Sequence, residues 1–241
     1  MKSVKDHTGS YAVVYDANRM EIPPPGYFNV EFWRSRNAVQ GEAVGRGSAW
    51  FLVSPEGPMV LRRYLRGGWA AKLSRQRYIF TGATRSRPFR EYQILSALSA
   101  LGLPVPKPVA AICEINGFTY AGALITATIP SVVTLADLLA QQQQGTAPGA
   151  DTWQRVGKCI HRFHAAGVWH ADLNARNILI DDQQRVFLID FDRAKYSPGK
   201  PVNGQANMNR LKRSLLKLWP SSTASGMETA WEQLMEAYNA G

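Results

Sequence analysis

The stretch HADLNARN at residues 170–177, with the IDF that follows it at residues 189–191, decides the fold of this chain. The first stretch has the form His-x-Asp-Leu-x-x-x-Asn. Directly after it, the sequence predicts two short apolar strands, residues 178–180 and 186–189, joined by a polar turn. A helix is expected before it, over residues 151–166, because apolar residues recur there at helical spacing. This ordered set is much more specific than a lone His-x-Asp, which is most often an ordinary polar turn.

Three oxygen-bearing side chains of this region suit phosphoryl transfer to a hydroxyl group, which needs a carboxylate near the acceptor and metal ions on the phosphates. We expect Asp172 to accept the hydroxyl proton. Asn177 and Asp190 are expected to hold Mg²⁺, which prefers oxygen ligands and takes few of them from the protein. Because a short hairpin returns the chain to its starting edge, these two ligands should lie side by side. His170 is grouped with Asp172 in the catalytic loop, where we expect it to brace the loop.

Outward from this stretch, the first half of the chain shows mainly strand patterns and the second half mainly helix patterns. Strands are expected at residues 49–53, 59–61, 109–114 and 118–126, with one helix over residues 88–101 that Ser86 caps. Further helices are expected over residues 134–139, 151–166, 208–218 and 227–239. We therefore predict an α+β chain with a sheet-rich N-lobe, residues 1–128, and a helical C-lobe, residues 129–241.

The catalytic stretch resembles the catalytic and metal-binding loops of protein kinases and their small-molecule relatives. The resemblance implies a bilobal protein-kinase-like fold whose N-lobe grips the phosphates of ATP. Gly45-Arg46-Gly47-Ser48 is similar to a shortened glycine-rich loop, in which backbone N–H groups approach phosphates closely. Arg62 stands where these kinases have a lysine, and Glu91 matches the glutamate that pairs with that lysine.

Two features depart from the protein-kinase pattern. Arginine at position 62 keeps the positive charge and adds a planar fork that can still hold phosphate. Lys72 or Arg63 remain open as residues that share this role. Asp190-Phe191-Asp192 replaces Asp-Phe-Gly, and no Ala-Pro-Glu follows it. Both absences favour a small-molecule kinase over a regulated protein kinase.

Several scattered pieces occur in a fixed order along the chain. They are Gly45-Arg46-Gly47, Leu61-Arg62, Arg66-Gly67-Gly68-Trp69, Lys72-Leu73, Arg77-Tyr78, Phe89-Arg90-Glu91, residues 102–108 (GLPVPKP), residues 170–175 (HADLNA) and residues 209–214 (NRLKRS). Together they resemble the 3-deoxy-D-manno-octulosonic acid (Kdo) kinases of the lipopolysaccharide kinase family. The resemblance implies ATP- and Mg²⁺-dependent phosphorylation of the Kdo 4-hydroxyl on Kdo–lipid A during lipopolysaccharide core synthesis. It also implies a Gram-negative bacterium and the cytoplasmic side of its inner membrane.

The charge of the chain is high and uneven. The formal net charge is +10, and residues 62–90 contain nine basic residues and no acidic one. A second basic cluster lies within residues 210–217. Such fields attract polyanions or the anionic surface of a membrane. The resemblance implies that basic residues of the first segment bind the Kdo carboxylate, the phosphates of lipid A or the membrane surface, with aromatic residues at the headgroup level. These basic residues are Arg66, Lys72, Arg75, Arg77, Arg85 and Arg87, and the aromatic residues are Tyr64, Trp69, Tyr78 and Phe80.

The N-terminal residues lack the apolar middle of a secretory signal, and no apolar run is long enough to span a bilayer. We therefore expect a cytoplasmic protein, and the family resemblance implies that it is peripheral on the inner membrane. Cys113 and Cys159 form no metal-ligand pattern and are expected to be buried, inert thiols.

Three alternatives stay open. In the first alternative, the acceptor is a heptose of the same lipopolysaccharide core. In the second, the chain is a basic nucleic-acid-binding module, although no zinc-finger or RNP pattern occurs and we expect no nucleic-acid partner. In the third, it is an inactive pseudokinase that acts as a scaffold, against which the intact Asp172, Asn177 and Asp190 argue.

Overall fold

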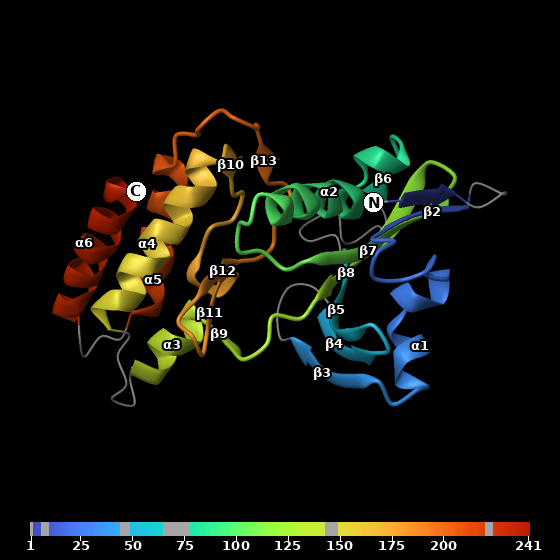
Figure 1. The fold of residues 1–241 in the computed structure, drawn as a ribbon, viewed down its shortest axis with the longest axis horizontal. Helices are drawn as coiled ribbons and strands as arrows, with labels where there is room; N and C mark the ends of the chain where they lie inside the picture. The colour runs from blue at the N-terminus through green and yellow to red at the C-terminus, as the bar shows by residue number, and fades with distance from the viewer. Residues whose placement is uncertain (1, 6–9, 44–48, 65–77, 143–148, 220–223) are drawn as a thin grey trace. The chain divides into compact units, whose positions relative to one another are not determined.

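The computed structural model describes residues 2–5, 10–43, 49–64, 78–142, 149–219 and 224–241 (Figure 1). The chain forms two compact units, the first from residues 1–97 and 106–128 and the second from residues 98–105 and 129–241. The predicted phosphate loop and much of the basic segment lie outside the described residues. These are Gly45, Arg46, Gly47, Ser48, Arg66, Trp69, Lys72, Arg75 and Arg77.

An antiparallel sheet makes up most of the first unit. Its strands follow the order β1-β2-β7-β8-β5-β4-β3, and β6 pairs with β8. Their bounds are β1 Lys2–Lys5, β2 Tyr11–Tyr15, β3 Val39–Ala43, β4 Ala49–Ser54, β5 Gly57–Arg63, β6 Tyr78–Ile79, β7 Pro108–Asn116 and β8 Thr119–Ala127. The strands predicted at the positions of β4, β5, β7 and β8 are confirmed, whereas β1, β2, β3 and β6 are additional strands.

Along the chain, helices occur between strands of this sheet. A 3-10 helix, η1 (Pro25–Phe28), leads into α1 (Val30–Arg34), whose Trp33 is buried and donates its indole N–H to the carbonyl of Tyr27 at 2.7 Å. A second short 3-10 helix, η3 (Ala83–Arg85), precedes α2 (Arg87–Ala100). The predicted helix is therefore confirmed. Ser86 directly precedes this helix, and its hydroxyl donates to the carbonyl of Ala83.

The second unit is mainly helical, with two small antiparallel sheets. Thr134 caps the start of α3, where its hydroxyl oxygen accepts from the Asp137 N–H at 3.0 Å and its hydroxyl donates to the Asp137 carboxylate at 2.7 Å. The helices are α3 Leu135–Gln142, α4 Ala150–Ala165, α5 Gln205–Leu218 and α6 Ala224–Ala240. The sheets are β12 (Val186–Leu188), β11 (Ile178–Asp181) and β9 (Val132–Thr134), in that order, and the pair β10 (Val168–Trp169) with β13 (Lys195–Tyr196).

A close approach of two helices packs this unit. A Cβ built on Gly157 of α4 would lie 2.1 Å from the carbonyl oxygen of Leu234 in α6, so no larger residue fits there without separating the helices. The sheet-rich first unit and helical second unit confirm the predicted α+β class. Both cysteines are buried as expected, and burial raises the pKa of Cys113 to about 11 and that of Cys159 to about 12. Among the described helices, none has the length and apolar character needed to cross a bilayer.

Candidate active site

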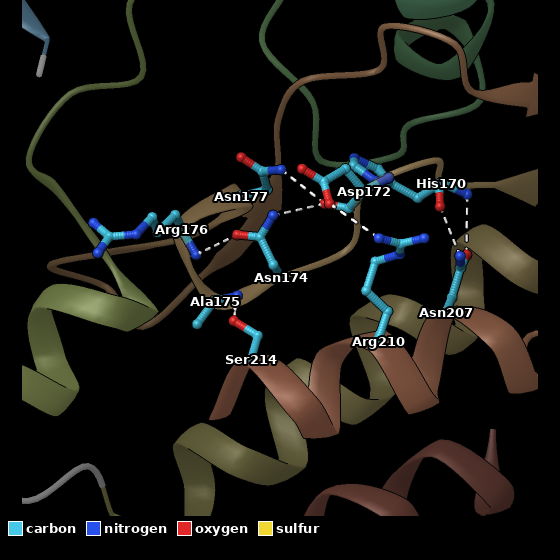
Figure 2. Close-up of polar contacts among 9 residues, drawn as sticks. All are labelled: His170, Asp172, Asn174, Ala175, Arg176, Asn177, Asn207, Arg210 and Ser214. Carbon is cyan, nitrogen blue, oxygen red and sulfur yellow. Dashed lines mark hydrogen bonds and ion pairs between the residues drawn. The ribbon is translucent and has the colours of Figure 1, made fainter. Parts of the chain in front are cut away.

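The catalytic loop, residues 170–177, runs from β10 to β11 in the second unit. Two amide side chains converge on the backbone carbonyl of Asp172, with Asn174 Nδ2 donating at 2.9 Å and Asn177 Nδ2 at 2.8 Å (Figure 2). Asn174 also caps the 3-10 helix η4 (Ala175–Asn177) by accepting from the Arg176 N–H. The backbone of Asp172 is thereby fixed, while 54% of its side-chain surface remains exposed. This exposure leaves the carboxylate accessible to an acceptor hydroxyl.

His170 braces the loop from within. Its imidazole is buried, with Nε2 2.9 Å from the carbonyl of Ile189 and Nδ1 3.1 Å from the N–H of Asp172. A carbonyl only accepts and an N–H only donates, so these partners assign the neutral tautomer with the proton on Nε2. Burial lowers the pKa of His170, which favours the same neutral form. With both ring nitrogens engaged by backbone, His170 acts here as a positioning residue.

Asp190 follows the hairpin and returns to the loop, as the sequence predicts. The N–H of Ile189 donates to the carbonyl of Asn177 at 3.1 Å, which joins the end of the hairpin to its beginning. Asp190 itself has φ 63°, a left-handed conformation that aspartate adopts more readily than most residues. The ring of the next residue, Phe191, is fully buried against Phe163 and His170. Asp172, Asn177 and the strand end that carries Asp190 are thus brought together.

The oxygen atoms at this junction fit a magnesium ion. The Asn177 amide nitrogen donates to Asp172, so its oxygen faces away from the loop carbonyl (Figure 2). That neutral oxygen and the Asp190 carboxylate are the donor types with which Mg²⁺ is held beside substrate phosphates. The described residues contain no cluster of three or more His, Cys, Asp or Glu side chains that would form an all-protein metal cage.

Asn207 holds the catalytic loop from helix α5, and sequence reasoning did not single it out. Its side chain is fully buried and bonds both backbone groups of His170, accepting from the N–H at 3.0 Å and donating to the carbonyl at 2.6 Å (Figure 2). Its oxygen is also 3.1 Å from Nε2 of His164, whose Nδ1 lies 2.9 Å from the hydroxyl of Tyr238. Burial lowers the pKa of His164, consistent with a neutral link in this chain of hydrogen bonds. The expected helix started at residue 208 and therefore excluded Asn207.

We expect Asn207→Ala to destabilise the second unit by about 2 to 4 kcal/mol, because it leaves buried backbone and imidazole groups of His170 and His164 without their partner. Urea unfolding measures this loss, and kcat should fall more than the affinity for ATP changes because the loop loses its brace. Asn239→Ala, at an exposed position of α6, is the matched control and should change stability by less than about 0.5 kcal/mol. Equal stability of the two variants would contradict the role of Asn207.

A cation also lies at the carboxylate of Asp172. Arg210, on α5, places Nη1 3.5 Å from Asp172 Oδ1, and its side chain is 44% exposed (Figure 2). The sequence showed Arg210 as one member of the second basic cluster and of the family-like piece at residues 209–214. Lys212 of the same cluster instead pairs with Glu228 of α6 at 3.2 Å. These two members of the cluster therefore have different intramolecular partners.

In the first unit, the structure brings Arg62 and Glu91 together as an ion pair. The Glu91 carboxylate is buried and also accepts from the hydroxyl of Tyr64, while Arg62 Nη2 lies 3.2 Å from that hydroxyl. Burial, and then the charge of Glu91, raise the pKa of Tyr64 well above its ordinary value, so the phenol stays protonated and donates. Arg63, the open alternative to Arg62, pairs with Glu114 at 3.2 Å instead.

The described aromatic residues of the basic segment differ from one another. Tyr64 is buried, so the expectation that it rests at a lipid headgroup is wrong for this residue. Tyr78 stacks on Tyr120 and accepts from Arg87 Nη1 at 2.6 Å, and the Arg87 guanidinium lies over the ring of Tyr78. Arg87 is therefore engaged within the unit, because the sheet places these aromatic rings beside the start of α2.

A protein-family model described as "Lipopolysaccharide kinase (Kdo/WaaP) family" matches residues 30–238. Curated relatives of this chain carry the name 3-deoxy-D-manno-octulosonic acid kinase. The relative from Stenotrophomonas maltophilia (strain K279a) is 39% identical over 235 residues, which cover 98% of this chain and 92% of the relative. The relative from Xanthomonas campestris pv. campestris (strain B100) is 39% identical over 234 residues, covering 97% and 92%.

A solved structure described as "WaaP in complex with acyl carrier protein" matches this fold with a TM-score of 0.58 and 14% sequence identity. The match covers 100% of this chain and 90% of that chain. At this identity the likeness concerns the fold, and it bears out the predicted kinase-like class.

Proposed function

Because the chain belongs to the lipopolysaccharide kinase (Kdo/WaaP) family and is therefore a kinase, we propose that it transfers the γ-phosphoryl group of ATP to the 4-hydroxyl of Kdo in Kdo–lipid A. The names of the curated relatives support Kdo over heptose as the acceptor. The observation that carries the proposal is the fixed backbone and accessible carboxylate of Asp172 in the catalytic loop.

The chemistry proposed for this site is an in-line displacement. The acceptor hydroxyl gives its proton to the Asp172 carboxylate, its oxygen forms a bond to the γ-phosphorus, and the bond from that phosphorus to the β-phosphate oxygen breaks. ADP leaves with the electron pair of the broken bond. A Mg²⁺ ion, when bound, neutralises charge on the phosphates, and Asn177 and Asp190 are the residues proposed to hold it. His170 and Asn207 keep the loop in place.

Arg62 is proposed to bind a phosphate of ATP, with Glu91 and Tyr64 holding the guanidinium in one orientation. We expect Arg62→Ala to raise KM for ATP by about 10- to 100-fold, the range for hydrogen bonds to charged groups. Steady-state kinetics at saturating acceptor measures this change. Because the substitution also leaves the buried Glu91 without its cation, Arg62→Lys, which keeps a charge there, should recover part of the loss.

Arg63→Ala is the comparison for this prediction, since Arg63 is the neighbouring cation and pairs with Glu114. It should leave KM for ATP nearly unchanged. A larger effect at Arg63 than at Arg62, or an effect of Arg62→Ala confined to KM for the sugar acceptor, would reject the placement of phosphate at Arg62.

We further propose that the protein works as a peripheral protein on the anionic cytoplasmic face of the inner membrane, where its acceptor is anchored. The net charge of +10 supports this, as do the large apolar side chains of Ile79 and Phe118, which are 70% and 92% exposed. On sequence grounds we also propose four basic residues as substrate-binding residues, namely Arg66, Lys72, Arg75 and Arg77. We likewise propose that the N-lobe grips the phosphates of ATP and that the C-lobe carries the catalytic and metal-binding loops.

Mass spectrometry of the purified protein incubated with ATP, Mg²⁺ and Kdo–lipid A tests the proposed function. We expect the lipid to gain the mass of one phosphoryl group, and ¹H–³¹P correlation of the product to place it on O4 of Kdo. Transfer only to a heptosylated acceptor would overturn the choice of Kdo in favour of a heptose kinase. ATP-independent binding without any transfer would support the scaffold alternative.

A further inference from the structure

We infer that Arg210 binds the carboxylate of the acceptor sugar acid and so sets the selectivity of the kinase for Kdo over neutral sugars. This inference rests on the proposed function, because it needs an anionic sugar as acceptor. It starts from the position of the Arg210 guanidinium, 3.5 Å from the proposed base Asp172 (Figure 2). A sugar whose hydroxyl reaches Asp172 would therefore have its nearby substituents at Arg210.

Helix α5 is docked on the catalytic loop at two points that flank Arg210. Asn207 bonds the backbone of His170, and the hydroxyl oxygen of Ser214 accepts from the N–H of Ala175 at 3.1 Å. Positions 207, 210 and 214 are spaced three and four residues apart and share one face of a helix. The side chain between the two docking points is thereby held over the loop, and in Figure 2 it points at Asp172. Of these three residues, only Arg210 carries a charge.

The contact with Asp172 does not by itself explain an arginine here. Both side chains are about half exposed, and ion pairs of that kind contribute roughly 0 to 1 kcal/mol to stability. The geometry thus favours a ligand anion as the functional partner of Arg210.

The chemistry of the proposed acceptor matches this need. Guanidinium is a planar fork that binds carboxylate through two parallel hydrogen bonds, which fixes orientation as well as adding affinity. In the pyranose form of Kdo, the carboxylate is on C2 and the hydroxyl to be phosphorylated on C4, two ring carbons away. A carboxylate seated on Arg210 would therefore direct the C4 edge of the ring toward Asp172. A neutral hexose or heptose has no carboxylate for Arg210 to bind.

A thermodynamic cycle that combines one enzyme substitution with one substrate modification tests the inference. Wild type and Arg210→Gln are each assayed on Kdo–lipid A and on the same acceptor synthesised with the Kdo carboxyl as a neutral primary amide. On wild type, the amide should lower kcat/KM by about 10- to 100-fold, and Arg210→Gln should lower it to a similar degree on the acid. The two changes together should cost little more than either alone, because they remove one shared interaction.

Two further variants separate binding from a general loss of charge or structure. Arg210→Lys should recover part of the activity on the acid and none on the amide, since it restores a cation without the fork. Arg155→Gln, at an exposed position of α4, removes the same charge from the same unit and should behave as wild type on both acceptors. KM for ATP should stay unchanged in all of these variants.

The outcomes distinguish this inference from the function on which it rests. If wild type phosphorylates Kdo–lipid A but the losses from Arg210→Gln and from the amide multiply, Arg210 does not bind the carboxylate and only the inference fails. An equal loss on acid and amide in Arg210→Gln would have the same meaning. If wild type transfers no phosphate to Kdo–lipid A at all, the proposed function fails and the inference falls with it.

Discussion

Replacing Asp172 by alanine is expected to lower kcat for phosphoryl transfer by about 100- to 10,000-fold, the range for loss of a general base. The acceptor hydroxyl then has no carboxylate to take its proton. The variant should still fold, because the Asp172 side chain is 54% exposed and its structural contacts with Asn174 and Asn177 are made by its backbone carbonyl. Single-turnover transfer from radiolabelled ATP measures the chemical step directly.

Two measurements accompany this prediction. Urea unfolding and ATP binding of Asp172→Ala should match those of wild type, which separates a chemical loss from a structural one. Asp182→Ala removes an exposed carboxylate from the turn between β11 and β12 and should leave kcat unchanged. A single-turnover rate of Asp172→Ala close to that of wild type would remove Asp172 from the role of base.

Asp190→Asn should weaken the magnesium-dependent binding of ATP by at least about 10- to 100-fold, a loss that even outer-sphere partners of a metal ion can produce. Asparagine is the sharper substitution than alanine, because residue 190 has φ 63° and asparagine tolerates this left-handed conformation. The charge is then removed while the turn into the buried Phe191 is kept. Titration with a fluorescent ATP analogue, across a series of Mg²⁺ concentrations, measures the change.

Binding of the analogue in the presence of EDTA is the control, because it should be equally weak in wild type and Asp190→Asn. Thermal unfolding without nucleotide should also agree between them. Unchanged affinity for Mg-ATP in the variant would reject Asp190 as a ligand. A loss that is the same with and without Mg²⁺ would mean that the substitution disturbs the nucleotide site in another way.

Sequence reasoning worked best where the interacting residues are near one another in the chain. The catalytic loop and its hairpin span residues 170–191, and their backbone bonds, such as Ile189 to Asn177, follow from the short turn between two strands. The main helices were predicted because their apolar residues recur at helical spacing. The pairing of Arg62 with Glu91 was expected from the family resemblance, although 29 positions separate them.

The first 43 residues were left without predicted elements, although they contain β2 and β3. Strand β2 is buried almost along its whole length and so lacks the alternation that marks a strand with one exposed face. Besides β1 it pairs with β7, with Tyr11 opposite Glu114, and the sequence offers no local signal for a pairing over so many residues. Strand β3 pairs irregularly with β4, with a shift between Val39 and Gly41, which weakens its pattern further.

The amino-acid sequence by itself determined the α+β class, the catalytic loop and the residues offered as base and metal ligands, because those features depend on short-range order along the chain. Tertiary structure alone decided that Asn207 holds the backbone of His170 and that Arg210, rather than Lys212, faces Asp172. In the sequence, Arg210 and Lys212 are polar residues of one expected amphipathic helix, and Asn207 directly precedes it. Which of them meets the loop depends on how that helix is rotated and docked, and this is set by packing between residues far apart in the chain.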